Sequence, residues 1–156
     1  MVKAKRDDLL GPLSAVSGII ERRHTLPILS NVLMERAGDG LSFLATDIEM
    51  QIISKGTAGG EGESKAITVG ARKLVDILRA LPADAEVSLQ LQDKRMIVKA
   101  GRSRFTLQTL PAEDFPRLAK PAGDVARFEL PQRTLRKHLA LVQYAMAQQD
   151  IRYYLN

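Results

Sequence analysis

The sequence predicts an α+β fold in which antiparallel strands are combined with two amphipathic helices. Segments with period-two alternation follow one another across short turns, a pattern typical of antiparallel hairpins. Two other segments repeat apolar residues at three- and four-residue spacing, which is typical of helices that bury one face. A segment rich in linker residues, 119–124, is followed by a pattern like the beginning of the chain, which indicates a second copy of the same unit.

Composition excludes several classes of protein. The 156 residues are 45% apolar, which is ordinary for a globular domain with its own core. No apolar run approaches the roughly 20 residues of a membrane span, and the first residues lack the apolar region of a secretory signal, so a cytoplasmic protein without membrane contact is expected. With no cysteine and two histidines, His24 and His138, neither disulfides nor a metal site nor a cofactor is expected.

The charge favours an acidic partner. The formal net charge is +5, and nucleic acid is the commonest partner of basic domains, although many basic domains bind nothing. Aromatic residues make up only 4% of the chain, and there is no tryptophan. Because modules that read single strands stack bases on aromatic side chains, contact with the nucleic-acid backbone is the expected mode.

The first half of the chain is predicted to form a short strand at 2–5, a helix and a three-stranded meander. Pro12 is tolerated only near a helix start, so the first turn is irregular or the helix begins there. The basic segment 21–24 ends the helix. The helix has six apolar positions, Leu9, Leu10, Leu13, Val16, Ile19 and Ile20, and the meander strands are expected at 31–36, 41–45 and 50–54.

The second half is predicted to contain a glycine-rich connection, a second helix and a final meander. The connection, 57–64, lacks the Gly-Lys-Ser/Thr ending of a phosphate-binding loop. Pro82 ends the helix, and Phe115 anchors a loop that begins at Pro111. The expected elements are a strand at 67–69, a helix at 71–81, and strands at 86–92, 95–99 and 102–110.

Three segments of the chain are distinguished. The first domain is assigned to 1–118, the linker to 119–124 and the start of a second domain to 125–156. At an offset of 125 residues Leu10 matches Leu135 and Asn31 matches Asn156, which a duplicated β-α-β unit explains. Since the second copy stops where its sheet should begin, the polypeptide is expected to be a truncated part of a longer protein.

Two motifs, Gly101 to Phe105 and Thr109 to Pro116, closely resemble elements of the bacterial sliding clamp family, the β subunit of DNA polymerase III. Further stretches similar to that family occur in the same order and spacing, at 25–31, 46–50 and 149–156. The resemblance covers the whole chain but only part of the family protein, which consists of three similar domains. It implies that this chain is the first domain and the opening of the second.

The resemblance implies a DNA-clamp fold, with antiparallel sheets outside and two helices per domain on an inner face around duplex DNA. The family's DNA-contacting residues match Arg23 and Gln149. A basic helix surface would bind phosphates without sequence specificity, whereas the charges alone are equally consistent with an ordinary solvated face. The basic residues on or near helices are Arg6, Arg22, Arg23, Arg72, Lys73, Arg79, Arg133, Arg136 and Lys137.

The strand 102–110 carries apolar side chains on one face and basic or polar ones on the other. From the residues alone, the cations around it could form a phosphate patch, an exposed strand face or one side of a subunit interface. In the family this edge joins the third domain of a second subunit. The interface positions of the family match Lys73, Arg95, Arg102, Arg104, Phe105 and Leu107.

A peptide-binding pocket is implied at the end of the chain. Arg152, Tyr154 and Leu155 match part of the pocket with which the family captures short linear motifs of polymerase subunits and the clamp loader, although the residues alone are also consistent with buried strand positions. Most of that pocket comes from sequence beyond Asn156, so it is expected to be incomplete.

The favoured function is therefore a non-catalytic processivity factor, a ring that tethers a polymerase to duplex DNA. The alternative is an independent, monomeric β-rich module that binds the nucleic-acid backbone. A third reading, metal-assisted phosphodiester hydrolysis at Asp47 and Glu49, is disfavoured because no other catalytic group converges on them in the sequence. Turn and strand-end roles are expected for this pair.

Overall fold

A computed structural model describes residues 1–20, 26–37, 40–60, 66–119, 123, 128–147 and 151 of the chain. The chain divides into two compact units, Met1–Ala119 and Lys120–Asn156, and each is described by itself. The first unit contains eight strands and two α-helices among its described residues, and the second contains one α-helix. The α+β class predicted from the sequence is confirmed.

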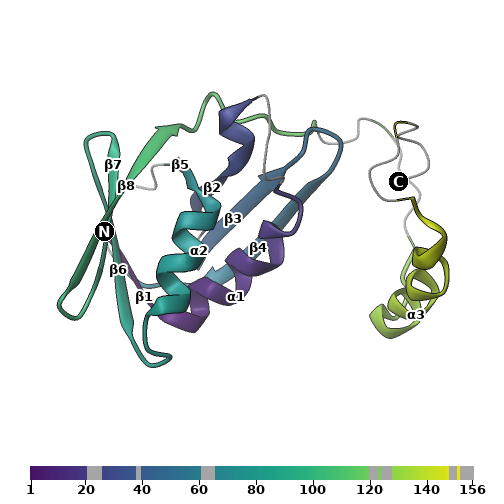
Figure 1. Ribbon diagram of the computed structural model, residues 1–156, viewed down its shortest axis with the longest axis horizontal. Coiled ribbons are helices and arrows are strands. Elements are labelled where there is room, and N and C mark those ends of the chain that lie inside the picture. Colours follow the sequence, from purple (N-terminus) through teal and green to yellow (C-terminus); the bar gives the residue numbers. More distant parts are fainter. Residues whose placement is uncertain are drawn as a thin grey trace. The chain divides into compact units, whose positions relative to one another are not determined.

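All eight strands belong to one antiparallel sheet (Figure 1), in the order β1-β6-β7-β8-β5-β2-β3-β4. β8 joins the two halves, since it pairs with β7 along most of its length and with β5 at its end. The strands are β1 (Val2–Lys5), β2 (Asn31–Ala37), β3 (Gly40–Thr46), β4 (Gln51–Thr57), β5 (Ile67–Gly70), β6 (Glu86–Gln92), β7 (Arg95–Ala100) and β8 (Ser103–Pro111).

The two ends of the sheet meet just beyond β4. Lys3 on β1 and Gly59 exchange two backbone N–H···O hydrogen bonds of 2.8 Å each. The sheet therefore curves until its first strand reaches the segment that follows its last strand.

Two helices pack against one face of this sheet, α1 (Arg6–Ser17) and α2 (Ala71–Ala80). They lie side by side in Figure 1 and contact each other. Leu9, Leu13 and Val16 of α1 are buried together with the inward-facing side chains of the strands. Burial of this kind contributes about 1.5–3 kcal/mol for each large aliphatic side chain, so the helix–sheet core is the main source of stability.

Pro12 lies in the seventh position of α1, not at its start as predicted. The helix is nevertheless continuous from Arg6 to Ser17. The close packing of α1 against β4 depends on Gly56, because a Cβ atom at this position would lie 2.0 Å from the backbone oxygen of Asp8 and 3.1 Å from Cγ of Pro12. Only glycine allows this approach of helix to strand.

A short chain of buried polar groups holds the two halves of the sheet together. The side-chain amide of Asn31 donates to the Thr68 hydroxyl at 3.0 Å, and that hydroxyl donates to the Leu110 carbonyl at 3.1 Å. These bonds run from β2 through β5 to β8. On the opposite side of the sheet from α1, Phe115 is buried against Leu33 and Leu44, which confirms its predicted role as the anchor of the loop after β8.

The second unit contains α3 (Gln132–Val142), followed by a 3₁₀ turn at Gln143–Ala145. None of the α3 residues is buried. The buried residues of α1, with Ile20 after them, are separated by four, three and four residues. The same separations occur in the second unit, where the side chains are exposed: Leu135, Leu139, Val142 and Met146. The two helix faces are thus related by an offset of 126 residues and not by the 125 expected from the sequence, which placed the half-buried Leu10 opposite Leu135.

The remaining elements lie close to their predicted positions. The predicted strands 2–5 and 86–92 match the observed bounds, the others differ by at most three residues at an end, and α2 ends one residue earlier than expected. The predicted end of the first helix at 21–24, the turn residues 38 and 39 and residues 61–64 of the glycine-rich connection lie outside the described residues.

Candidate nucleic-acid and subunit interfaces

The exposed face of α2 is basic. Arg72, Lys73 and Arg79 are exposed, while Leu74, Val75 and Leu78 turn the opposite side of the helix into the core. Asp76 is the one acidic residue of this helix, so the face keeps a net positive charge. Such a face attracts phosphates without reading base sequence.

Arg6, which the sequence placed on the same basic surface, is occupied elsewhere. Its guanidinium donates to the Leu81 carbonyl through Nε at 3.4 Å and Nη2 at 3.3 Å, and it pairs with Asp7. These bonds tie the start of α1 to the end of α2. Arg6 is therefore a structural residue, and its inclusion in a phosphate-binding surface is not supported.

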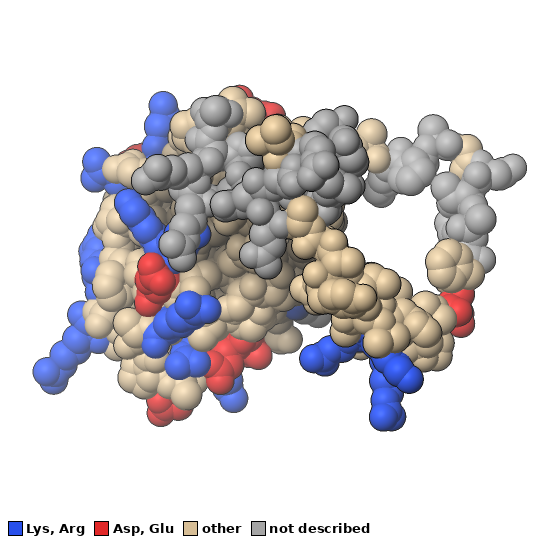
Figure 2. Space-filling model, turned by 45° about the vertical axis from the view of Figure 1, so that its right-hand side comes forward, with Lys and Arg blue, Asp and Glu red and all other residues tan. Residues whose placement is uncertain are grey.

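Helix α3 carries three exposed cations, Arg133, Arg136 and Lys137, and no acidic residue. Figure 2 shows Lys and Arg side chains projecting from both units. Each unit therefore carries exposed cations on a helix, at positions that the sequence analysis named.

Five of the predicted site residues lie outside the described residues. They are the DNA-contact candidates Arg23 and Gln149 and the peptide-pocket candidates Arg152, Tyr154 and Leu155. Their assignments stay predictions.

β8 has an open backbone edge. Ser103–Gln108 pair with β7 on one side, whereas among the described strands only the last three residues, Thr109–Pro111, pair with β5 on the other. Phe105 and Leu107 point into the core and Arg104 points outward, as the alternation predicted. An open strand edge can accept a further strand from another chain.

Five of the six predicted interface residues line three hollows around β8. Lys73 and Leu107 line a hollow of about 430 Å³ together with Ile20 and Gln108. Arg95 and Arg104 line a second one of about 520 Å³, and Arg102 lines a third of about 700 Å³. Phe105 is half-buried against the core. The structure thus groups the six residues around one strand without bringing them into one site.

Asp47 and Glu49 do not lie on a strand, because Ile48 between them has a φ of +83°. The Asp47 carboxylate accepts hydrogen bonds from the backbone N–H groups of Glu49, at 3.0 Å, and Met50, at 2.7 Å. The Thr46 hydroxyl also donates to the Met50 carbonyl at 2.6 Å. The carboxylate of Asp47 therefore closes the β3–β4 turn, which confirms its predicted structural role.

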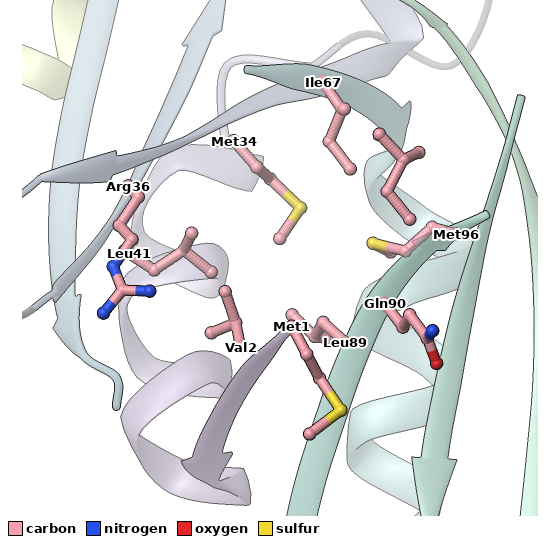
Figure 3. A pocket seen from close by; sticks show the side chains of 10 residues that line it. Met1, Val2, Met34, Arg36, Leu41, Ile67, Leu89, Gln90 and Met96 are labelled. Atoms are coloured by element: carbon pink, nitrogen blue, oxygen red, sulfur yellow. The ribbon is translucent and has the colours of Figure 1, made fainter. Parts of the chain in front are cut away.

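A small pocket of about 90 Å³ lies between the two halves of the sheet (Figure 3). Met34 and Met96 point into it from opposite sides, and Leu41 and Leu89 complete its apolar wall. Its lining contains no carboxylate, histidine or hydroxyl group. The lining is mainly apolar, with Arg36 and Gln90 as its polar side chains.

Within the described part of the chain, no three or more His, Cys, Asp or Glu side chains are grouped as metal ligands would be. None of the helices described there has both the length and the apolar character that a membrane-spanning segment requires.

Comparison with known families gives a match over most of the chain. Residues 2–119 match the family described as "DNA polymerase III beta subunit, N-terminal domain". The beta sliding clamp of Pseudomonas aeruginosa is 46% identical over 152 residues, which are 97% of this chain and 41% of that protein. The beta sliding clamp of Escherichia coli is 47% identical over the same length and share of each chain.

Solved structures agree with these matches. The crystal structure of the DNA polymerase III subunit beta from Pseudomonas aeruginosa matches with a TM-score of 0.89 and 45% identity, covering 100% of this chain and 42% of that one. The Caulobacter crescentus pol III beta structure matches with a TM-score of 0.90 and 41% identity, covering 99% and 41%. The DNA-clamp fold implied by the resemblance is confirmed, and the chain spans about two fifths of the length of the curated relatives it matches.

Proposed function

The chain belongs to the DNA polymerase III beta subunit family, and on that premise we propose that it supplies the first domain of a sliding clamp. The clamp is a ring that encircles duplex DNA without sequence specificity and tethers the replicative polymerase during DNA replication, in the cytoplasm. It is a non-catalytic subunit of a nucleotidyltransferase complex. The open edge of β8 at Ser103–Gln108 supports this proposal most directly, because a ring of sheets needs an edge at which the next domain can continue the sheet.

In this proposal the helices face the DNA. The exposed cations of α2 and α3 supply the phosphate-attracting surface. Arg23 and Gln149, assigned by resemblance, contact the duplex. Because phosphates carry no base information, the ring can slide along any sequence.

The second subunit is proposed to join at β8. Lys73, Arg95, Arg102 and Arg104 supply cations around the open edge, and Phe105 and Leu107 supply apolar surface. Leu107 is buried and Phe105 half-buried within their own unit, so both also stabilise the domain that presents the edge. A change at either position therefore has to be tested for folding before it is interpreted as an interface effect.

We assign the first domain to 1–118, the linker to 119–124 and the opening of a second domain to 125–156. In the second domain, Arg152, Tyr154 and Leu155 contribute to the pocket for short motifs of polymerase subunits and the clamp loader. No cofactor is needed for any of these roles.

Ring formation can be tested with a chimera in which residues 1–119 replace the matched first domain of the Pseudomonas aeruginosa beta sliding clamp. The chimera should load onto nicked circular DNA and slide off when the circle is linearised. Retention on linear DNA equal to that on circles would contradict the ring and favour an independent, monomeric module that binds the backbone.

Two variants of this chimera separate DNA contact from ring closure. Arg23→Ala should weaken DNA binding equally on all sequences and lower the salt slope by about one unit, since one phosphate contact is lost. Phe105→Asp should break the dimer, because a charge buried in an apolar contact costs several kcal/mol. Sequence-selective loss in the first variant, or an unchanged dimer by sedimentation for a folded second variant, would contradict the respective role.

A further inference from the structure

The outer face of the sheet carries a row of cations that the sequence did not reveal. Strand register places Lys3 of β1 opposite Ser88 of β6, Ser88 opposite Lys99 of β7, and Lys99 opposite Arg104 of β8. Three of these four residues are basic, and they occupy one line across four adjacent strands. With strands about 4.8 Å apart, the row is about 14 Å long.

All four side chains of this row lie on the face away from the helices. Their strand neighbours Val2, Val87, Val98 and Phe105 pack into the core, and alternate residues of a strand point to opposite faces. Lys3, Lys99 and Arg104 are exposed. The row is therefore on the opposite side of the sheet from α1 and α2.

The cations of the row are not neutralised within the described part of the chain. No hydrogen bond or ion pair is formed there by the side chain of Lys3, Lys99 or Arg104. Lys99 and Arg104 are moreover directly opposite each other, where like charges destabilise a sheet. A row of this kind favours a polyanionic ligand that would relieve the repulsion.

The row borders a hollow of about 700 Å³. Lys3, Lys99 and Arg102 line it, together with the hydroxyl-bearing residues Ser88 and Ser103. Its acidic residues, Asp84 and Glu86, belong to the connection after α2 and the start of β6, so they lie toward one end. Ammonium and guanidinium groups beside hydroxyls are the donors that bind phosphate oxygens.

We propose that this row, Lys3–Ser88–Lys99–Arg104, is a second nucleic-acid site, which binds the phosphate backbone of a single strand on the outer face of the sheet. The site is separate from the duplex-binding helix face proposed above. Because Arg104 is also assigned to the subunit contact proposed above, Lys3 and Lys99 are the cations of the site in the ring.

Two observations favour a nucleic-acid strand over an acidic protein segment. Ile97, the large apolar residue of β7 on this face, is only 4% exposed, so it offers no accessible apolar anchor of the kind on which protein partners usually depend. A phosphate backbone needs no such anchor, because charge and counterion release are sufficient. The row is moreover one line of cations about 14 Å long, which matches a single backbone of phosphates.

The test is the binding of the 156-residue chain to a short fluorescein-labelled oligothymidylate, measured by fluorescence anisotropy between about 50 and 200 mM salt. The double variant Lys3→Gln/Lys99→Gln should bind about tenfold more weakly. Its salt slope should fall by about 1.4, since each lost phosphate contact on a single strand contributes about 0.7.

Lys55→Gln is the matched control for the single variant Lys99→Gln. Lys55 is exposed on the outer side of β4, where it lies opposite Ser42 and away from the row. Its replacement by Gln changes the net charge by the same amount as Lys99→Gln. The control should bind the oligothymidylate within twofold of the unchanged chain, whereas Lys99→Gln should lose about 0.7 of the slope. Equal losses in the two variants would show that only net charge matters and would overturn the proposal.

Glu86→Gln should bind the oligothymidylate about twofold more tightly, because it removes an acidic group from the hollow. Misfolding would weaken binding, so it cannot produce this result. Unchanged or weaker binding by this variant would contradict the assigned site.

A duplex of the same length separates this site from the helix face. Arg72→Gln/Lys73→Gln should weaken duplex binding, while Lys3→Gln/Lys99→Gln should leave it within twofold. A larger loss on duplex than on single strand in the Lys3/Lys99 variant would overturn the single-strand assignment. If Arg72→Gln/Lys73→Gln failed to weaken duplex binding while the Lys3/Lys99 variant behaved as expected, that result would count against the proposed clamp function and not against this site.

Discussion

Helices α1 and α3 have the same apolar spacing and opposite surroundings. Leu9, Leu13 and Val16 of α1 are at most 1% exposed, whereas Leu139 and Val142 of α3 are 57% and 59% exposed. α1 lies on a curved sheet, and the described residues of the second unit include no strand. The comparison shows that an amphipathic pattern specifies which face a helix will bury, while a sheet is needed to bury it.

The energetic difference follows from burial. Each large aliphatic side chain of α1 gains about 1.5–3 kcal/mol by leaving water, and those of α3 gain little. An isolated helix shorter than about 12–15 residues is marginal in water, and α3 has 11. Its stability is therefore expected to be local and low.

The largest expected effect is a difference in backbone hydrogen exchange between the two units. Residues 86–109 lie in paired strands over the core and should exchange slowly, through openings that approach global unfolding. Residues 131–146 should exchange fast, because opening α3 exposes little further apolar surface. Mass spectrometry of the dilute monomer measures both segments at once, and uniformly slow exchange would contradict the distinction between the units.

A matched pair of leucine variants tests the same contrast by stability. Leu13→Ala removes a fully buried side chain from α1 and should lower the free energy of unfolding by about 2–5 kcal/mol. Leu139→Ala makes the same chemical change at the corresponding position of α3 and should stay within about 0.5 kcal/mol. Denaturant unfolding monitored by circular dichroism gives both values. Comparable losses would show that α3 is packed as tightly as α1.

A pair of glycine variants tests the close contact between α1 and β4. Gly56→Ala places a Cβ atom against the Asp8 backbone oxygen and should cost about 1–3 kcal/mol, because the helix must move away from β4. Gly11→Ala, in α1 itself, meets no atom within 4 Å and should gain about 1 kcal/mol through helix propensity. Opposite signs in thermal unfolding are expected. Stabilisation by both would contradict the tight helix–strand contact.

Much of the fold was predictable because its signals are local. Alternation placed the strands, three- and four-residue spacing placed the helices, and Phe115 was identified as a loop anchor from its place between two prolines. Pro12 was not predicted correctly, because tertiary contacts outweigh local preference there. Pro12 stays inside a packed helix, and Ile48 adopts a left-handed conformation that its neighbours Thr46 and Asp47 hold by hydrogen bonds.

The candidate sites were less predictable, since they depend on register between distant strands. Arg104 was assigned from its motif, but no local signal in the sequence places Lys3 beside Ser88 or Ser88 beside Lys99. The hydrogen bonds of Arg6 were not predictable for a similar reason, because its partner, the Leu81 carbonyl, is 75 residues away. Charge patterns identify cations, whereas the fold decides which of them are free.

The smallest predicted effect lies at the end of the first unit, where tight packing gives way to the linker. Arg117 forms a two-pronged ion pair with Glu35 of β2, with Nη1 at 3.3 Å from Oε2 and Nη2 bonded to Oε1, and the Leu118 N–H donates to the Gln51 side chain at 3.0 Å. Both charged side chains are partly exposed, at 47% and 33%, so solvent screening limits the pair to about 0.5–1 kcal/mol.

Arg117→Ala should therefore lower the free energy of unfolding by that small amount, and it should speed hydrogen exchange in 112–118 while leaving α3 unchanged. Glu35→Ala, measured as its control, should have the same effect, and the double variant should be no worse than either single one because the pair is lost only once. If Arg117→Ala instead changed hydrogen exchange in 131–146, the Arg117–Glu35 ion pair would couple the two units. The contrast between the packed helix α1 and the exposed helix α3 would then not hold.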